Sequence, residues 1–563
     1  MSKKLLGLSI YLLNKKYFII ILSLLFIFAL SRFMYLDSDL PPWNIAYYQP
    51  IDEFYYTLQA FNFFNYGVWW YTPYDFLTNF TYFESELENI MTFFSLETFG
   101  NNYYGLRGAS VISVIMIVLM ITYLVGAFAV KDDKYKLIII TMIYMIVDFS
   151  FNLSGRIAEP TVFRMLALVL IIFVGNKYLK GNITQKKSFS FGFLAFSSFI
   201  FVYLTNAFIV PAVGMSILLI SLKENRGVAL RNSGFFILGT LISLIIFLIF
   251  HYTLYNENFF SAYNEIQKLF SARTSISHLN IFDTILSFGK SFFQTNIFMY
   301  NLSLLFIFLF SLPLYIFMTF IKKKNLDILI LSLFIMLFLQ SLYINDYPQR
   351  KLIILFPLVL LIIVRVLSER DLLFSLLKNN KFKTIYTLLI GIGFWYIIKD
   401  IEKINIIFST LNIILSLVSL LIFLDILSQK NIRTIVLLIF MTSISVTNIY
   451  LNYTYIYSEP QYTYKNIMID IGRKVGKEQV AGCYSHAFRL YNEIEPLLNS
   501  YCYEYIKDKE KIIEDTRRLE KEYNLTYILG CDSECTNTYY NLSVSSGKLC
   551  WLRTPDSFGY PID

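Results

Sequence analysis

The 563-residue chain has few charged side chains and few of the residues that bind transition metals. Only 16% of its residues are charged, and it contains 3 histidines and 5 cysteines. So low a charge content, combined with 56% hydrophobic residues, argues against an ordinary soluble enzyme and is typical of a polytopic membrane protein. With so few histidines, the helical His-Glu-x-x-His motif of zinc proteases is absent.

Long apolar runs recur along the whole chain. A bilayer core about 30 Å thick requires roughly 20 residues of helix. About thirteen runs approach that length. They cover residues 17–35, 108–130, 137–150, 160–176, 190–205, 207–222, 234–252, 295–320, 327–344, 352–367, 384–399, 405–427 and 433–452. The sequence therefore predicts a polytopic α-helical membrane protein with about thirteen transmembrane helices.

Lysine and arginine gather in every second loop between these runs, beginning with the N-terminal segment. Cytoplasmic loops retain positive charge during insertion, so the pattern predicts a multi-pass plasma-membrane protein with a cytoplasmic N-terminus and an outward C-terminus. The net charge of +8 is spread over these loops. It favours orientation in the membrane, with lipids as neighbours, over binding of nucleic acid.

The chain changes character near Ser458, which separates a membrane module, residues 1–457, from a polar tail, residues 458–563. Alternating helical and strand-like patterns predict a small outward α/β domain in the tail, with strands near 479–484 and 525–530 and helical spacing over 488–497. The predicted spans contain no cysteine; all five lie in the tail, at Cys483, Cys502, Cys531, Cys535 and Cys550. This segregation favours disulfides in an oxidising compartment over a zinc site.

Charged residues stand at three points where predicted helices meet the outward face. The first outward loop, residues 36–107, is rich in aromatic residues and carries an acidic pair. The second and third points are short loops. The residues are Asp52 and Glu53 in the first loop, Arg156 and Glu159 before the fourth span, and Arg350 and Lys351 before the tenth. Ionisable groups at a membrane edge are functional candidates, and these six could converge on a lipid headgroup.

Three segments resemble motifs of GT-C glycosyltransferases: PIDEFYYTLQAFNFFNYG in the first loop, GRIAEPTVFRM in the second and QRKLIILFP later in the chain. Together with the arrangement of spans and the outward tail, they look like protein O-mannosyltransferases and aminoarabinose transferases. The resemblance implies a sugar donor carried on polyprenyl phosphate, transfer with inversion, and no metal in the nearest enzymes.

The chain departs from that pattern at two places. Related enzymes often place Asp where this chain has Glu159. The Trp-Trp-Asp signature of oligosaccharyltransferases is also missing, because the only Trp-Trp pair, Trp69-Trp70, lies in the first loop and precedes Tyr71. Transfer of a whole oligosaccharide to asparagine is therefore disfavoured.

The chemistry of such a donor requires a base for the acceptor hydroxyl and cations for the departing phosphate. We predict Asp52 as the base, with Glu53 and Glu159 as neighbouring acids of the catalytic site. Arg350, together with Lys351 or Arg156, is predicted to hold the phosphate. The acceptor could be a lipid, a protein or a glycan.

Each assignment has a structural alternative. Glu159 could cap the fourth helix before Pro160, and Arg156 could pair with it. Arg350 and Lys351 could anchor the chain at lipid headgroups, and loop acids are commonly solvated.

Two functional alternatives also stay open. A divalent ion could bind the acids, although no cofactor is expected. A transporter or flippase of lipid-linked sugars is the rival function, against which the scarcity of mid-membrane charge argues.

Overall fold

The structure, a computed structural model, describes most of the membrane module and part of the tail. It covers residues 2–38, 53–67, 85–129, 133–202, 204–255, 302–343, 353–372, 406–428, 434–482, 489–498, 526–531 and 550–553, and Lys521, with the single positions 55, 371, 459 and 461 left out. The predicted span 384–399 and the predicted residues Asp52, Arg350 and Lys351 lie outside this part.

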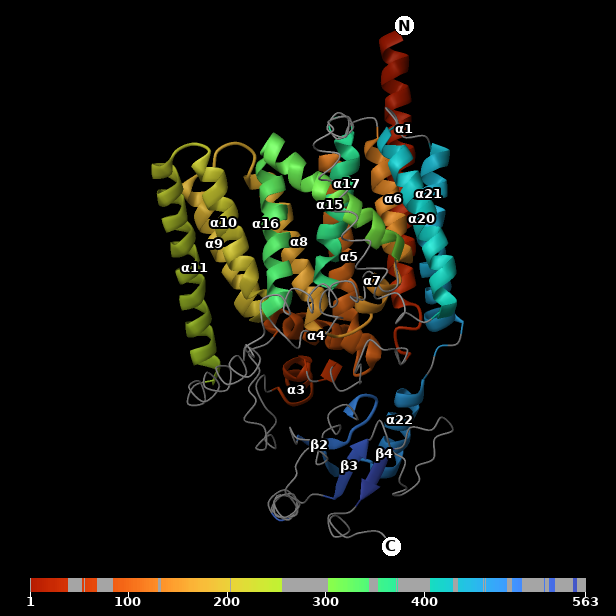
Figure 1. Cartoon of the computed structure of the whole chain (residues 1–563). Helices are drawn as coiled ribbons and strands as arrows, with labels where there is room; N and C mark the ends of the chain where they lie inside the picture. Colours follow the sequence, from red (N-terminus) through yellow and green to blue (C-terminus); the bar gives the residue numbers. More distant parts are fainter. Residues whose placement is uncertain are drawn as a thin grey trace.

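Long helices stand side by side and form a bundle (Figure 1). They are α1 (Ser2–Phe33), α5 (Tyr103–Phe128), α6 (Lys134–Val147), α8 (Pro160–Tyr178), α9 (Gln185–Ser197), α10 (Ile209–Leu222), α11 (Arg226–Tyr255), α15 (Leu302–Lys322), α16 (Asn325–Tyr343), α17 (Phe356–Ser368), α20 (Ile406–Ser428) and α21 (Thr434–Asn452). Every predicted span other than 384–399 overlaps one of these helices.

Five helices in the described part are long and apolar enough to cross a membrane: Lys16–Phe33, Tyr103–Phe128, Pro160–Tyr178, Arg226–Phe250 and Leu302–Lys322. Shorter apolar helices lie between them in the bundle, among them Asn325–Gln340 and Ile353–Ser368. The centre of the bundle is occupied by α17, in which every residue from Phe356 to Ser368 is buried. Apart from Arg365 and Ser368, this helix is apolar on every face, as a helix covered by neighbouring helices or lipid can be.

Shorter elements cover the end of the bundle away from the N-terminus (Figure 1). They are α3 (Leu58–Tyr66), α4 (Glu86–Phe99) and α7 (Phe149–Ser154). The first two belong to the long first loop, and α4 packs tightly on α5. A Cβ atom added to Gly108 would lie 2.4 Å from Oγ of Ser95 and 3.1 Å from the ring of Phe99, so a larger residue would push these α4 side chains aside.

The tail folds beyond these elements (Figure 1). It contains α22 (Thr463–Val475) and strands β1 (Gln479–Gly482), β2 (Glu495–Leu498), β3 (Tyr527–Cys531) and β4 (Cys550–Arg553). The strand order is β2-β1-β3-β4; β1 is parallel to both β2 and β3, and β4 is antiparallel to β3. Strands thus occur near 479–484 and 525–530, as predicted.

The helical prediction over 488–497 is wrong at its end, because Glu495–Leu498 forms strand β2. Pro496 explains the difference: proline lacks the N–H that a helix interior requires, whereas it is tolerated on an edge strand such as β2. The apolar residues of this segment still reach a core, since Leu490 and Ile494 are fully buried.

One hydrophobic cluster joins the tail to the first loop and to the start of α5. It contains Phe54, Ala60, Phe61, Leu96, Tyr103, Leu106, Ala158, Met468, Ile471, Val475, Val480, Leu490 and Ile494. Because the residues come from segments more than 400 positions apart, the first loop and the tail are held together as one packed layer at the end of the bundle.

Candidate functional site

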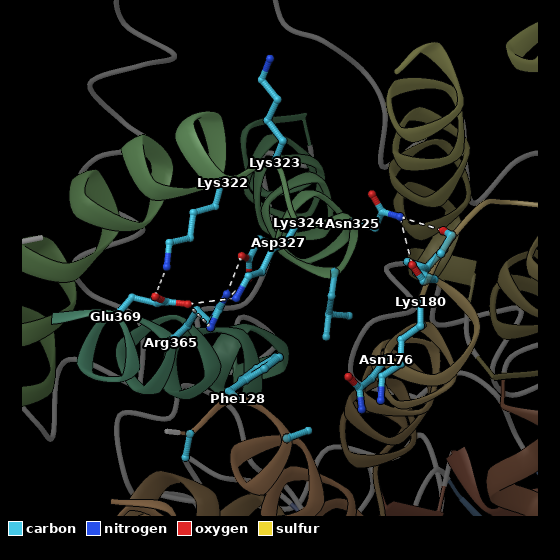
Figure 2. Close-up of a pocket in the computed structure, with 16 residues that line it drawn as sticks. Phe128, Asn176, Lys180, Lys322, Lys323, Lys324, Asn325, Asp327, Arg365 and Glu369 are labelled. Carbon is cyan, nitrogen blue, oxygen red and sulfur yellow. Dashed lines mark hydrogen bonds and ion pairs between the residues drawn. The ribbon is translucent and has the colours of Figure 1, made fainter. Parts of the chain in front are cut away.

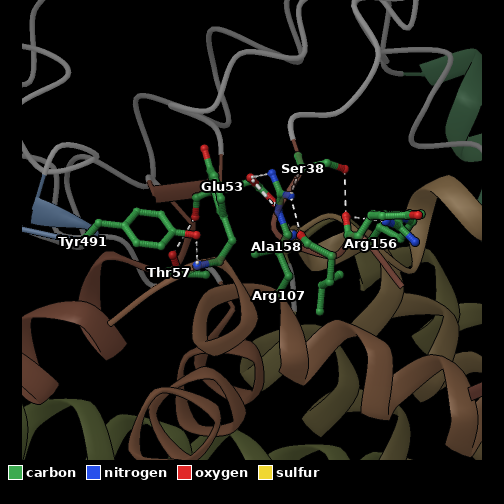
Figure 3. A network of polar contacts seen from close by, with 10 residues as sticks. Ser38, Glu53, Thr57, Arg107, Arg156, Ala158 and Tyr491 are labelled. Atoms are coloured by element: carbon green, nitrogen blue, oxygen red, sulfur yellow. Dashed lines mark hydrogen bonds and ion pairs between the residues drawn. The ribbon is translucent and has the colours of Figure 1, made fainter. Parts of the chain in front are cut away.

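The acid Glu53, which opens the described part of the first loop after residue 38, is completely buried and paired with Arg107 of α5 (Figure 3). Nε of Arg107 donates to Oε1 at 2.9 Å, and a terminal nitrogen donates to Oε2 at 2.8 Å. The backbone N–H of Ala158 donates to the same Oε1 at 2.9 Å. Glu53 therefore ties the first loop to α5 and to the second loop, which precedes α8.

Arg107 is also buried, with 1% of its surface exposed. Its remaining terminal nitrogen donates to the carbonyl oxygens of Leu36 and Ser38, just beyond α1, and its guanidinium lies 4.0 Å from the ring centre of Tyr103. The charge is thus compensated by a carboxylate, two carbonyls and an aromatic face. A buried guanidinium in a low-dielectric layer requires such partners.

Arg156, predicted to hold the donor phosphate, lies in the same layer but makes different contacts. Its guanidinium donates to carbonyl oxygens at the end of α1: Met34 at 2.7 Å, Tyr35 at 2.6 Å and, more weakly, Ser31 and Arg32. A cation at the C-terminal end of a helix stabilises the exposed carbonyls and the negative end of the dipole. Burial lowers the pKa of Arg156 to about 10, so the side chain stays charged near neutral pH.

Glu159 occupies the N-cap position of α8, with Pro160 as the first helical residue, and only 5% of its surface is exposed. Its side chain makes no capping hydrogen bond. Glu159 therefore stands at the cap position that the structural alternative requires, but its side chain does not cap the helix with a hydrogen bond.

A further acid, Glu88, lies close to this group. It stands in the first turn of α4 and is fully buried, and its carboxylate accepts no hydrogen bond from the described residues. Burial, together with the negative charges of Glu159 and then Glu53, raises the pKa of Glu88 well above its usual range. Ser85, the N-cap residue of α4, has a positive φ of 79°. Left-handed backbone at a non-glycine residue is costly and tends to occur where function constrains the chain.

The tail contributes Tyr491 to the layer (Figure 3). Its hydroxyl oxygen accepts a hydrogen bond from the backbone N–H of Tyr103, and its own N–H donates to the carbonyl of Asn101. Burial raises the pKa of Tyr491 to about 12, so it stays protonated near neutral pH. The tail is thereby fixed to the first turn of α5, next to Arg107.

The structure brings together three of the six predicted site residues: Glu53, Arg156 and Glu159 all lie in this layer. Two residues of this layer, Arg107 and Glu88, were not predicted from the sequence. Arg107 could have been found as a charge near the start of an apolar helix, which is a functional or structural marker. Glu88 follows Glu84 and Glu86 in an otherwise aromatic stretch, and that cluster was a detectable signal. Among the described residues, no three acids, histidines or cysteines lie close enough to hold a metal ion.

We expect Glu88→Gln to change how stability depends on pH. Below the ordinary pKa of about 4.5 both folded and unfolded wild type are protonated at this position. Above it the unfolded chain loses the proton that the folded chain retains, so wild-type stability falls as pH rises toward the raised pKa. The glutamine side chain of the variant does not ionise, so the stability of the variant does not fall in this way. Its melting temperature should therefore gain on wild type as the pH rises above the ordinary carboxyl pKa. A constant difference across that range would show that the carboxylate ionises normally.

No protein-family model and no curated protein matches this chain. Among solved structures, apo ArnT from Cupriavidus metallidurans is 11% identical, and the match covers 92% of this chain and 93% of that one with a TM-score of 0.52. ArnT bound to undecaprenyl phosphate is 12% identical over 85% of each chain, with a TM-score of 0.48.

The oligosaccharyltransferase AglB from Archaeoglobus fulgidus, in complex with an inhibitory peptide and a dolichol-phosphate, is 11% identical. That match covers 92% of this chain and 69% of AglB, with a TM-score of 0.48. At such identities the likeness concerns the fold, and the match to apo ArnT extends over nearly the full length of both chains. The chain therefore has the fold of ArnT, which is the GT-C membrane fold that the sequence motifs predict.

Proposed function

We propose that the protein is an integral membrane glycosyltransferase that moves a sugar from a polyprenyl-phosphate carrier to an acceptor at the end of the bundle covered by α3, α4 and the tail. The observation that supports this most is the anchoring of Glu53. In a chain with the fold of ArnT, Arg107 of α5 and the N–H of Ala158 hold Glu53, the second acid of the first-loop pair. The site is built from the loops at the predicted outward face.

In the proposed reaction Asp52 is the base. It takes the proton of the acceptor hydroxyl as the acceptor oxygen attacks the anomeric carbon of the sugar, and the bond from that carbon to the phosphate oxygen breaks. Attack from the side opposite the phosphate inverts the anomeric centre. The leaving phosphate carries negative charge, which Arg350 and Lys351 are proposed to stabilise.

Glu53 has a different part in this proposal. Both of its carboxylate oxygens accept hydrogen bonds from Arg107, and one also accepts from Ala158. A carboxylate engaged in this way positions its neighbours instead of accepting a proton. Consecutive Cα atoms are about 3.8 Å apart, so the anchor restricts where Asp52 can lie. Arg156, whose donors face the end of α1, is likewise proposed to support the layer.

Purified full-length protein in liposomes tests the proposal against the flippase alternative. The liposomes contain a polyprenyl-phosphate sugar with a radiolabelled sugar, and lipid, peptide and glycan acceptors are supplied. If the protein is a glycosyltransferase, polyprenyl phosphate is released and the label appears in an acceptor. If labelled lipid crosses the bilayer intact and no polyprenyl phosphate is released with any acceptor, the protein is a transporter and the proposal is wrong.

An outward tail is proposed to carry disulfides among its five cysteines, all of which lie outside the predicted spans. Peptide mapping of membranes prepared without reductant should give linked peptides that reduction separates. Complete alkylation of all five thiols in such membranes would contradict the disulfides and the oxidising location.

A further inference from the structure

A cavity of about 620 Å³ opens at the end of the bundle away from the tail, between the ends of α5, α8, α15 and α17 and the start of α16 (Figures 1 and 2). Its lining carries five cationic and two acidic side chains, a net charge of +3. The charged residues are Lys180, Lys322, Lys323, Lys324, Arg365, Asp327 and Glu369. This cavity has no part in the proposed glycosyl transfer.

Ion pairs neutralise only part of that charge. The guanidinium of Arg365 binds both oxygens of Asp327, at 2.9 and 3.0 Å. Glu369 pairs with Lys322, and with Lys324 at 3.0 Å. Within the described part of the chain, the ammonium groups of Lys180 and Lys323 make no ion pair. Figure 2 shows Lys323 extending away from Asp327 and Arg365, whereas Lys180 lies beside Asn176.

Asn176 supplies a second and independent sign of a ligand. It lines the cavity with 7% of its surface exposed, and its Nδ2 is buried and has no hydrogen-bond partner among the described residues. A buried donor without a partner destabilises the fold unless a ligand supplies an acceptor. Such a donor beside uncompensated lysines is the arrangement that an anionic oxygen would satisfy.

The turn between α15 and α16 is held in place, so the site is largely preformed. Lys323 has a positive φ of 48°. The amide of Asn325 donates to the carbonyls of Leu179 and Gly181, and Nζ of Lys223 binds both the carbonyl of Lys323 and Oδ1 of Asn325. These contacts fix the lysine turn to the segment that follows α8, which carries Lys180, two residues beyond the end of the helix and four beyond Asn176.

Exposed apolar side chains lie next to the lining residues in the sequence and indicate the source of the anion. Phe320 and Ile321, next to Lys322, are 68% and 51% exposed, and Tyr178 of α8 is 41% exposed. Aromatic and aliphatic side chains of this kind, immediately beside lysines, are typical of the depth of lipid headgroups. We propose that the cavity binds the phosphate of an anionic phospholipid headgroup, with Asn176 and Lys180 as donors to its oxygens.

Binding can be measured on the purified full-length protein in detergent, by native mass spectrometry and by thermal unfolding. The probes are phosphatidylglycerol, phosphatidylcholine and inorganic phosphate. Phosphatidylglycerol should raise the melting temperature of wild type more than phosphatidylcholine does. Lys180→Gln should weaken its binding about tenfold, as expected for loss of one charged hydrogen bond. Lys177→Gln, an exposed change one turn earlier that does not line the cavity, should leave binding unchanged.

Asn176→Leu separates binding from folding, because removing an unpartnered buried amide should maintain or raise stability in phosphatidylcholine. In that variant the extra stabilisation by phosphatidylglycerol should fall. If Lys177→Gln and Lys180→Gln weaken phosphatidylglycerol binding equally, the lipid is attracted to a basic surface in general, and the proposed site is overturned. Stabilisation by inorganic phosphate alone, with no response to phosphatidylglycerol, would overturn the lipid as its ligand.

Discussion

Replacing Arg107 with methionine is expected to lower the free energy of unfolding by about 3–5 kcal/mol, since it leaves a buried carboxylate without its countercharge. Glu53 has no exposed surface, and Arg107 supplies two of the three described groups that donate to its carboxylate. The carbonyls of Leu36 and Ser38 would also lose their donor. The change should loosen the layer in which α1, the first loop and α5 meet.

Thermal and denaturant unfolding in detergent measure the effect. The matched control is Arg473→Met, which removes an exposed ion pair with Asp470 and should cost at most about 1 kcal/mol. The double variant Glu53→Gln with Arg107→Met should be more stable than Arg107→Met alone, because no charge is then left buried. If Arg107→Met costs no more than the control, the pair does not hold the layer together.

Asp52→Asn is expected to reduce glycosyl transfer by about 10²–10⁴-fold, the contribution of a well-placed general base. Asparagine has nearly the same shape as aspartate but cannot accept the acceptor proton at neutral pH. The measurement is the rate of polyprenyl-phosphate release in liposomes under saturating donor and acceptor. Donor binding should change far less than the rate, because the base acts on the acceptor hydroxyl.

Asp75→Asn provides the control for this prediction, since Asp75 lies in the same loop but outside the acidic motif. It should transfer sugar at a rate close to that of wild type. Turnover by Asp52→Asn at the wild-type rate would remove Asp52 from the mechanism and leave Glu159 as the next candidate for the base. Glu53→Gln differs from both, because it should lower the melting temperature together with the rate.

The course of the chain through the bundle could be read from the sequence. Runs such as 108–130 and 160–176 coincide with α5 and α8, because a helix that buries its backbone polar groups in an apolar environment must be long and apolar. The motif around Asp52 and Glu53 likewise indicated the GT-C fold. The 488–497 segment shows the limit of periodicity, since its apolar spacing suits a helix while Pro496 and the neighbouring β1 make a strand.

The sequence by itself determined the class of fold, the apolar spans and the loop segments that contain charged residues. These features depend on local hydrophobicity and composition. Only the tertiary structure decided the partners. Glu53 pairs with Arg107, 54 positions later, and Arg156 binds the end of α1 instead of Glu159. Such pairings depend on which loops pack together once the charges leave water. Burial requires each charge to have a close partner, and proximity in space, not in sequence, determines which one it finds.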